Sequence, residues 1–361
     1  MNRMADPVVA EVLDSDEWDG FVESLPGDVL AQTSAWGDTK DTRFNTTILG
    51  VKESSGLVAG CLLLEGRIGP VQVTYAPRGP LYAAGHEDKT SLIVNSIVSR
   101  ARGPKPAVIL LQPATETSIL QAAMSAAGFG RAPVDITTPA TVEISLKPET
   151  ETLFAALRSS RRRNIRKAEK AGLAVRRGGE DDLATFLELH RNTARRQGFE
   201  PMSESYLDRQ WKILGEAGMM SVYLAELDGE AMSAATVTTF GDRAVFKLAG
   251  LSEAKAARDV RASDYLHWRV MVDAKERGFA YYDLGGFNKE AARIMSQGGE
   301  IPEDIRNSAS QFKLGFGGDV RLLPEARWRV SPRILGFIQD PTAAAAQRFK
   351  PLRAALTRLR D

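Results

Sequence analysis

Two segments of this chain, nearly half its length apart, carry the same succession of secondary-structure signals. Residues 47–64 indicate a strand, a Ser-Ser-Gly turn and a second strand, and residues 221–238 indicate a strand, an Asp-Gly turn and a second strand. Each hairpin is followed by another β-rich run, at 71–82 and 243–252, and then by a helix. Hairpins are common in proteins, so the pattern favours a duplicated domain without establishing one. It does constrain the fold to one in which strands and helices alternate.

The helix of the second half has clear signals along its length. Leu266, Val270 and Ala274 form an apolar stripe at helical spacing. Ser263 can cap this helix and Gly278 can end it. A short apolar strand follows and stops at two glycines. The order of hairpin, strand, helix and strand resembles the core of the GNAT acyltransferases, so each half is expected to be one such unit.

Length and composition bound the class of protein. The 361 residues predict about two domains, and 43% apolar with 26% charged residues excludes long disorder and a membrane bundle. Residues 1–20 lack the apolar core of a secretory signal, and no apolar run approaches the 18 or so residues of a membrane span. The single cysteine, Cys61, cannot form an internal disulfide. The expected address is cytoplasmic, with at most peripheral membrane contact, and the oligomeric state stays unknown.

Charge is balanced over the whole chain but concentrated locally. Lys and Arg number 47 against 46 Asp and Glu, so only a local cluster can indicate a charged partner. Residues 151–172 predict one strong helix that Gly172 ends, and 347–361 form a second basic segment. Such a run most often marks a solvated helix face, and its alternative is attraction of phosphates on a tRNA, a nucleotide or an anionic lipid. The basic residues of the helix are Arg158, Arg161, Arg162, Arg163, Arg166, Lys167 and Lys170.

Several kinds of chemistry lack their sequence signals. His86, His190 and His267 have neither nearby cysteines nor His-x3-His spacing, so no metal site is expected. The motifs of serine hydrolases, P-loop enzymes and dinucleotide-binding proteins are missing. GNAT enzymes that use acyl-CoA carry a glycine-containing loop at the start of their main helix, whereas residues 258–263 contain no glycine. The sequence therefore predicts no cofactor and argues against acyl-CoA as a donor.

Two patterns in the first half are candidate binding motifs. Gln32, Trp36 and Lys40 are spaced i, i+4 and i+8, which predicts that they share one helix face. The plain alternative is a core tryptophan with a lysine whose stem covers it. Residues 75–80, Tyr-Ala-Pro-Arg-Gly-Pro, predict a rigid turn that projects Arg78.

Two more patterns lie in the second half. Residues 193–199, Thr-Ala-Arg-Arg-Gln-Gly-Phe, follow a helix that Gly198 can stop. Residues 312–318, Phe-Lys-Leu-Gly-Phe-Gly-Gly, place Lys313 in an aromatic and glycine-rich setting, where a cation can lie near a ring.

Together these motifs resemble the Fem family, the non-ribosomal peptidyl transferases that build peptidoglycan cross-bridges, in its short-chain form. The resemblance implies an α/β (α+β) fold of two tandem GNAT-like domains, each a mixed β-sheet flanked by helices. It assigns 1–148, completed by 319–361, to an acceptor-binding first domain and 149–318 to the second. The motifs occur in this order: Gln-x3-Trp-x3-Lys at 32–40, Pro-Arg-Gly-Pro at 77–80, the basic helix at 161–170, Thr-x2-Arg-x-Gly-Phe at 193–199, Tyr-Asp-Leu-Gly-Gly at 282–286 and Phe-Lys-x-Gly-Phe-Gly-Gly at 312–318.

The resemblance also implies the substrates. The donor would be aminoacyl-tRNA, and the acceptor the stem peptide of UDP-MurNAc-pentapeptide or lipid II. Lys313 matches the lysine that is essential for transfer, and Lys40 and Arg196 match residues that hold the acceptor's phosphates across the domain interface. Arg195 is an adjacent alternative for the role of Arg196. Asp283 is a candidate general base by position, and its alternative is a carboxylate satisfied by the neighbouring glycine N–H groups.

Further site residues follow from these motifs. No heptad-patterned helical pair like the arm of longer family members is present, so a donor contact through such an arm is not expected. The expected substrate-binding residues are Trp36, Lys40, Arg78, Arg196, Tyr206, Tyr265 and Phe312. The expected tRNA-binding residues are Arg161, Arg162, Arg163, Arg166 and Lys167.

The expected mechanism needs neither a metal nor a covalent nucleophile. The acceptor amine attacks the tRNA ester while Lys313 neutralises charge on the tetrahedral intermediate or on the departing ribose oxygen. Three other functions stay open: acyl-CoA-dependent transfer to a sugar nucleotide or polysaccharide precursor, tRNA-dependent transfer to a small amine in secondary metabolism, and a non-enzymatic RNA-binding module.

Overall fold

The chain divides by its contacts into two units, which are described one at a time. The first holds the residues up to Thr137 and those from Leu323 on, and the second holds Thr138–Leu322. The basic segment 347–361 lies outside the described residues. The computed structural model describes residues 9–11, 14–40, 44–54, 56–101, 106–133, 135–300, 303–305 and 308–331.

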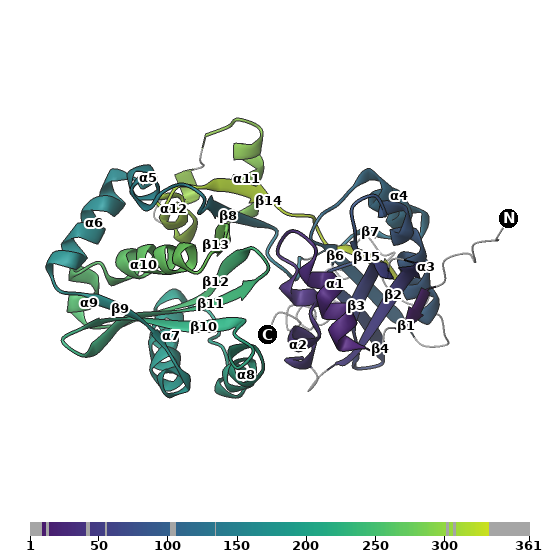
Figure 1. The fold of residues 1–361 in the computed structure, drawn as a ribbon, viewed down its shortest axis with the longest axis horizontal. Coiled ribbons are helices and arrows are strands. Elements are labelled where there is room, and N and C mark those ends of the chain that lie inside the picture. Colours follow the sequence, from purple (N-terminus) through teal and green to yellow (C-terminus); the bar gives the residue numbers. More distant parts are fainter. Residues whose placement is uncertain are drawn as a thin grey trace, which may run out of the picture. The chain divides into compact units, whose positions relative to one another are not determined.

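The first unit is built on one mixed sheet (Figure 1). Its β4 and β6 run parallel, and the other neighbouring strands are antiparallel. The strand order is β1 (Val9–Glu11), β2 (Asn45–Glu53), β3 (Gly56–Ile68), β4 (Val71–Arg78), β6 (Ala107–Pro113), β15 (Arg327–Val330) and β7 (Gly130–Arg131), with β5 (Leu81–Tyr82) beside β3. The helices are α1 (Ser15–Glu23), α2 (Ser34–Asp38), α3 (Thr90–Arg100) and α4 (Ser118–Ala126).

The second unit repeats this plan. Its β12 and β13 run parallel, and the other neighbours are antiparallel. The strand order is β14 (Asp319–Leu322), β8 (Ala140–Ser145), β13 (Tyr281–Gly286), β12 (Arg243–Leu251), β11 (Glu230–Phe240), β10 (Met220–Leu227) and β9 (Ala174–Gly178). The helices are α5 (Thr150–Ala156), α6 (Ser159–Lys170), α7 (Leu183–Gln197), α8 (Glu204–Gln210), α9 (Lys255–Asp259), α10 (Ala262–Glu276), α11 (Lys289–Ser296) and α12 (Ala309–Leu314).

Both units share one order of elements: two helices, a hairpin, a strand, a helix and then a strand parallel to the one before it. This confirms the predicted α/β class with two mixed sheets flanked by helices. Because β8 pairs with both β13 and β14, residues 138–148 and β14 belong to the second unit by contact. The boundaries expected from the sequence were 148/149 and 318/319.

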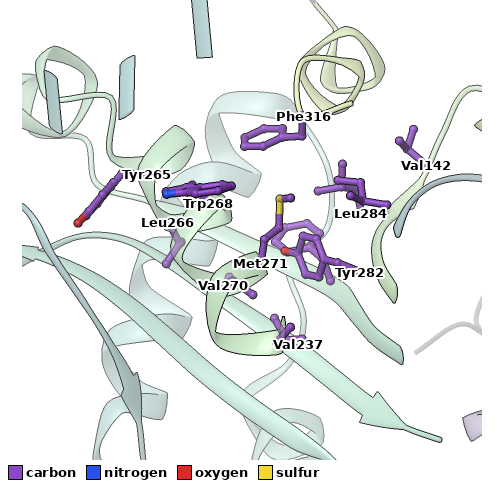
Figure 2. Packing of buried hydrophobic residues seen from close by; sticks show 14 of the residues in the cluster. Val142, Val237, Tyr265, Leu266, Trp268, Val270, Met271, Tyr282, Leu284 and Phe316 are labelled. Carbon is purple, nitrogen blue, oxygen red and sulfur yellow. The ribbon is translucent and has the colours of Figure 1, made fainter. Parts of the chain in front are cut away.

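The central helix of the second unit buries the predicted stripe. Leu266, Val270 and Ala274 of α10 are buried in the core of the sheet, and Figure 2 shows the first two beside Met271 and Tyr282. Strand β10 is buried on both faces, since α10 covers one side and α7 and α8 the other (Figure 1). Buried faces on both sides explain the long apolar runs of these strands.

The start of α10 differs from the prediction. Ser263 does not cap this helix, because the helix begins at Ala262 and Arg261 occupies the cap position with a left-handed backbone, φ +61°. Ser263 lies in the first turn, with its hydroxyl 3.5 Å from that of Ser233.

The basic segment is not one helix. Leu157 and Arg158 are extended and separate α5 from α6, because the Leu157 side chain is buried in the core. Two carbonyls at the end of α5, those of Ala155 and Leu157, accept hydrogen bonds from the Arg162 guanidinium. The expected stop at Gly172 is confirmed: its φ is +80°, and the Leu173 N–H bonds to the Ala168 carbonyl as in a Schellman cap.

Candidate active site

Lys313 lies near the C-terminal end of α12, against the end of β13. Its side-chain nitrogen donates a hydrogen bond to the carbonyl oxygen of Gly286, 2.6 Å away. The side chain is half-buried. Burial lowers the pKa of Lys313 to about 8, although the charge of nearby Asp283 acts in the opposite direction. The protein therefore holds an ammonium group that loses its proton far more readily than an ordinary lysine.

Asp283, on β13, is the buried anion of this site. Its Oδ1 accepts hydrogen bonds from the Thr141 hydroxyl of β8 and, at 2.6 Å, from the Gly285 N–H. Both bonds stabilise the charged carboxylate. The glycine contact is the alternative that the sequence left open, and the role of Asp283 as a base stays a prediction.

An aromatic wall backs the lysine. The ring centres of Phe312 and Phe316 lie 5.4 and 5.2 Å from that of the His267 imidazole. The ring centre of Phe246, on β12, lies 4.5 Å from it. His267 is buried, with its Nδ1 3.2 Å from the Tyr282 hydroxyl. Burial and then the positive charges of Lys313 and Arg161 lower the pKa of His267 to about 3. The imidazole is therefore neutral near pH 7. From the sequence, His267 was considered only as a metal ligand, and no role at this site was predicted for it.

Two positions of the 312–318 motif require glycine for steric reasons. A Cβ on Gly315 would lie 2.5 Å from the Arg161 side chain, so only glycine fits there without displacement. Gly318 has a left-handed backbone, φ +84°, and a Cβ would lie 2.5 Å from the Glu143 carbonyl. The motif is thus shaped to bring α12 close to α6 and β8.

The basic helix α6 has two kinds of arginine. Arg161 and Arg162 turn inward: Arg161 pairs with Asp264 at 2.5 Å, and Arg162 bonds to the end of α5. The other predicted tRNA-binding residues, Arg163, Arg166 and Lys167, are exposed, with Arg166 5.4 Å from the centre of the Phe154 ring. The helix therefore has an exposed basic face and an inward face on which Arg161 and Arg162 are half-buried.

The first unit brings Trp36 and Lys40 together but not Gln32. The Lys40 nitrogen lies 5.2 Å from the centre of the Trp36 ring, and the Lys40 side chain is buried. The prediction that the three residues share one helix face is wrong. The short helical turn Leu30–Gln32 is separated from α2 by the extended Thr33, which caps α2. The Gln32 amide instead bonds to the backbone of β3 and β4, at Leu62 and Pro77. Gln32 is a structural residue.

Arg78 ends β4 in a buried position. It has a left-handed backbone, φ +58°, and its guanidinium pairs with Asp28 at 3.2 Å. Its Nη1 is buried and has no hydrogen-bond partner among the described residues. The expected projection of Arg78 from the turn is therefore wrong, and substrate binding by it stays a prediction.

The remaining predicted residues of the second unit differ in exposure. Arg196, in the last turn of α7, is exposed, and its neighbour Arg195 pairs with Glu253 at 3.0 Å. Tyr206 of α8 is half-buried and accepts a hydrogen bond from Gln210. Tyr265 of α10 is buried, which raises its pKa. Of the predicted residues, Lys313, Asp283, Phe312 and Arg161 meet at one place.

Two further observations concern membrane-spanning helices and metal-binding groups among the described residues. None of the helices described is both long enough and apolar enough to cross a bilayer. Within the same residues, no three His, Cys, Asp or Glu side chains are grouped so that they could hold a metal ion.

The fold defines the class as a protein of two GNAT-like units in tandem. A model of the acetyltransferase (GNAT) domain matches residues 155–293. A solved structure of FemX has a TM-score of 0.79, with 18% identity, over 91% of this chain and 98% of that one. L-PGS from Bacillus licheniformis has a TM-score of 0.54, with 11% identity, over 94% of this chain and 96% of that one. These likenesses describe the fold.

Sequence comparison relates the chain to the Fem family. The FemAB family model matches residues 13–129, and the lipid II:glycine glycyltransferase of Staphylococcus aureus strain MRSA252 is 26% identical over 228 residues, 59% of this chain and 54% of the relative. Together these matches support a Fem-family protein with tandem GNAT-like domains. The chain spans about half the length of the curated relatives it matches.

Proposed function

We propose that this protein transfers an amino acid from aminoacyl-tRNA to the amine of a peptidoglycan precursor stem peptide. The observation that carries the proposal is the half-buried Lys313, with its lowered pKa, bonded to Gly286 beside Asp283. The matched relatives, named as glycyltransferases acting on lipid II, support an aminoacyl group and a muropeptide acceptor. Either lipid II or UDP-MurNAc-pentapeptide fits this chemistry.

The reaction exchanges an ester for an amide. The acceptor nitrogen attacks the ester carbonyl, a C–N bond forms, and the C–O bond to the tRNA ribose breaks. Charge develops on the carbonyl oxygen and then on the departing ribose oxygen, which receives the proton that the amine loses. The Lys313 ammonium, still mostly protonated at pH 7, donates to these oxygens. The buried Asp283 carboxylate keeps that ammonium in place by its charge.

The surface charge of α6 supports aminoacyl-tRNA as the donor. Arg163, Arg166 and Lys167 form an exposed basic face on α6, and tRNA phosphates would bind there through charge attraction. For the acceptor, Lys40 and Arg196 stay the proposed phosphate ligands, each within its own unit. Neither role requires a metal.

Acyl-CoA is the competing donor because a GNAT domain model matches this chain. One observation counts against acyl-CoA: residues 258–263 comprise the end of α9, the left-handed Arg261 and the start of α10, where acyl-CoA enzymes have a glycine loop. The donor assay therefore includes acyl-CoA in parallel.

The test supplies tRNA charged with a labelled amino acid and, separately, lipid II or UDP-MurNAc-pentapeptide. The proposal predicts label in the muropeptide, abolished by ribonuclease treatment before mixing, and none from acyl-CoA. Transfer that survives ribonuclease, or that occurs only with acyl-CoA, would contradict it. Transfer to a small amine but to neither precursor would replace the acceptor.

A further inference from the structure

The helix that carries Lys313 is short and is held at its C-terminal end by α6. The Phe312 carbonyl accepts hydrogen bonds from the Gly315 N–H at 3.0 Å and from Nη2 of Arg161 at 3.4 Å. The Gly315 carbonyl accepts one from the Arg158 N–H at 3.0 Å. Carbonyls at a helix end lack partners within the helix, so these bonds fix the last turn of α12. The residues on both sides of Lys313 are thereby tied to the start of α6.

Arg161 also grips the ring of Phe312. Its guanidinium carbon lies 4.2 Å from the centre of that ring and 5.6 Å from the centre of the Phe316 ring. Such cation–π contacts strengthen when the pair is shielded from water. One side chain therefore holds both the backbone and the ring of the residue directly before Lys313.

The guanidinium is itself anchored to α10. Its Nη1 pairs with Oδ1 of Asp264 at 2.5 Å, and the same oxygen accepts a hydrogen bond from Asn164 at 3.1 Å. Asp264 is only 6% exposed, so an unpaired carboxylate there would be costly. A planar guanidinium can pair, bond to a carbonyl and lie on a ring at once, and an ammonium cannot.

Gly315 completes the arrangement. Its φ is −69°, which any residue can adopt, yet a Cβ there would lie 2.5 Å from Nε of Arg161. The glycine is needed for the approach of the arginine and not for backbone freedom. The two residues therefore act as a matched pair.

We propose that Arg161 is a positioning residue for Lys313, which fixes the end of α12 so that the lysine nitrogen meets the Gly286 carbonyl. This rests on the proposed function only in taking Lys313 as the residue that assists transfer. It replaces the expectation that Arg161 contacts tRNA. The charged and titratable groups that face this cluster are Asp283, Asp264 and His267.

The test uses the full-length protein with Arg161→Lys, which keeps the charge but loses the fork. Arg277→Lys is the matched control, because Arg277 also pairs with an α10 carboxylate, Asp273 at 3.6 Å, and lies 5.0 Å from a phenylalanine ring, Phe279. Competitive labelling with an amine-reactive reagent across pH, read by mass spectrometry, gives the pKa of Lys313 without any substrate. A double variant, Arg161→Gln with Asp264→Asn, serves if the single variant fails to fold.

The expected result is a rise of the Lys313 pKa by at least one pH unit in Arg161→Lys, because a loosened α12 exposes the ammonium to water. The kcat falls at least tenfold, tRNA affinity stays unchanged, and Arg277→Lys alters none of these. An unchanged Lys313 titration in a folded Arg161 variant overturns the proposal, as does a loss of tRNA affinity without a change in titration. If the wild-type protein transfers nothing from aminoacyl-tRNA, the proposed function fails, while the labelling result still decides the positioning role.

Discussion

The side-chain nitrogen of Lys313 lies 2.6 Å from the carbonyl oxygen of Gly286, the last residue of β13. This bond places a cation at the end of the strand that runs parallel to β12. Because burial lowers the Lys313 pKa to about 8, its charge changes within an accessible pH range.

The first prediction concerns pH. If the protonated lysine assists transfer, the ratio of the wild-type rate to the Lys313→Arg rate is constant below about pH 7 and falls above about pH 8, since the guanidinium stays charged. The ratio cancels the ionisation of the acceptor amine itself. Single-turnover rates between pH 6 and 9.5 measure it. A ratio that rises with pH would make the neutral lysine a base instead.

The second prediction concerns His267. Its pKa of about 3 in the folded protein lies below the ordinary value near 6.5, so the unfolded chain binds a proton first as the pH falls. His267 therefore lowers the unfolding free energy by up to about 1.4 kcal/mol per pH unit below roughly pH 6.5. Denaturant titrations of wild type and His267→Gln measure the difference in unfolding free energy, which we expect to change with pH below about pH 6.5 and to be constant above about pH 7. Ring NMR signals of His267 that titrate between pH 5 and 8 would refute this.

The third prediction concerns the fit between Gly315 and Arg161. Gly315→Ala forces the arginine to move and is expected to cost about 1–3 kcal/mol of unfolding free energy. Gly20→Ala is the control, because nothing lies within 4 Å of its Cβ position in α1, and it should be neutral or stabilising by about 0.5–1 kcal/mol. Equal stability changes in the two variants would show that the steric account is wrong.

The fourth prediction separates the two faces of α6. Arg163→Glu or Lys167→Glu is expected to weaken tRNA binding at least severalfold and to flatten its salt dependence, because these side chains are exposed. Arg162→Gln should leave tRNA affinity unchanged, since that guanidinium bonds to the end of α5. Filter binding at several salt concentrations measures both. The surface assignment fails if the exposed variants bind tRNA as tightly as wild type.

The fifth prediction concerns Gln32. Its amide is fully buried and bonded to β3 and β4, so Gln32→Leu is expected to cost about 2–4 kcal/mol of unfolding free energy. Gln121→Leu, at an exposed position of α4, should change it by less than about 0.5 kcal/mol. Urea unfolding compares them. A Gln32→Leu protein as stable as the wild type would contradict the structural role of Gln32.

The helical periodicity of apolar residues correctly predicted the buried face of α10. Leu266, Val270 and Ala274 lie on one face at helical spacing, and all three side chains are buried as expected. The interruption between α5 and α6 at Leu157 was not predicted, because the sequence does not distinguish a buried leucine with an extended backbone from a leucine within a helix. Its cause is tertiary packing, which no local pattern records.

The inward turn of Arg161 did have a signal. Ile165 and Ala168 are the buried residues of α6, and Arg161 precedes Ile165 by one helical turn, so it lies on the same face. The high density of basic residues along 158–170 indicated a basic surface but not which of them share the face of Ile165 and Ala168. Its partner Asp264 is more than a hundred residues away, and no spacing rule in one sequence joins two residues so distant.

The central claim is that Lys313 assists aminoacyl transfer from tRNA. Its most direct measurement is the single-turnover rate of amide formation from charged tRNA and lipid II, for wild type and Lys313→Met, at saturating enzyme. We expect the rate to fall by about 10²–10³ in the variant while its fold and tRNA affinity stay those of the wild type. An equal rate in a folded Lys313→Met protein would contradict the account.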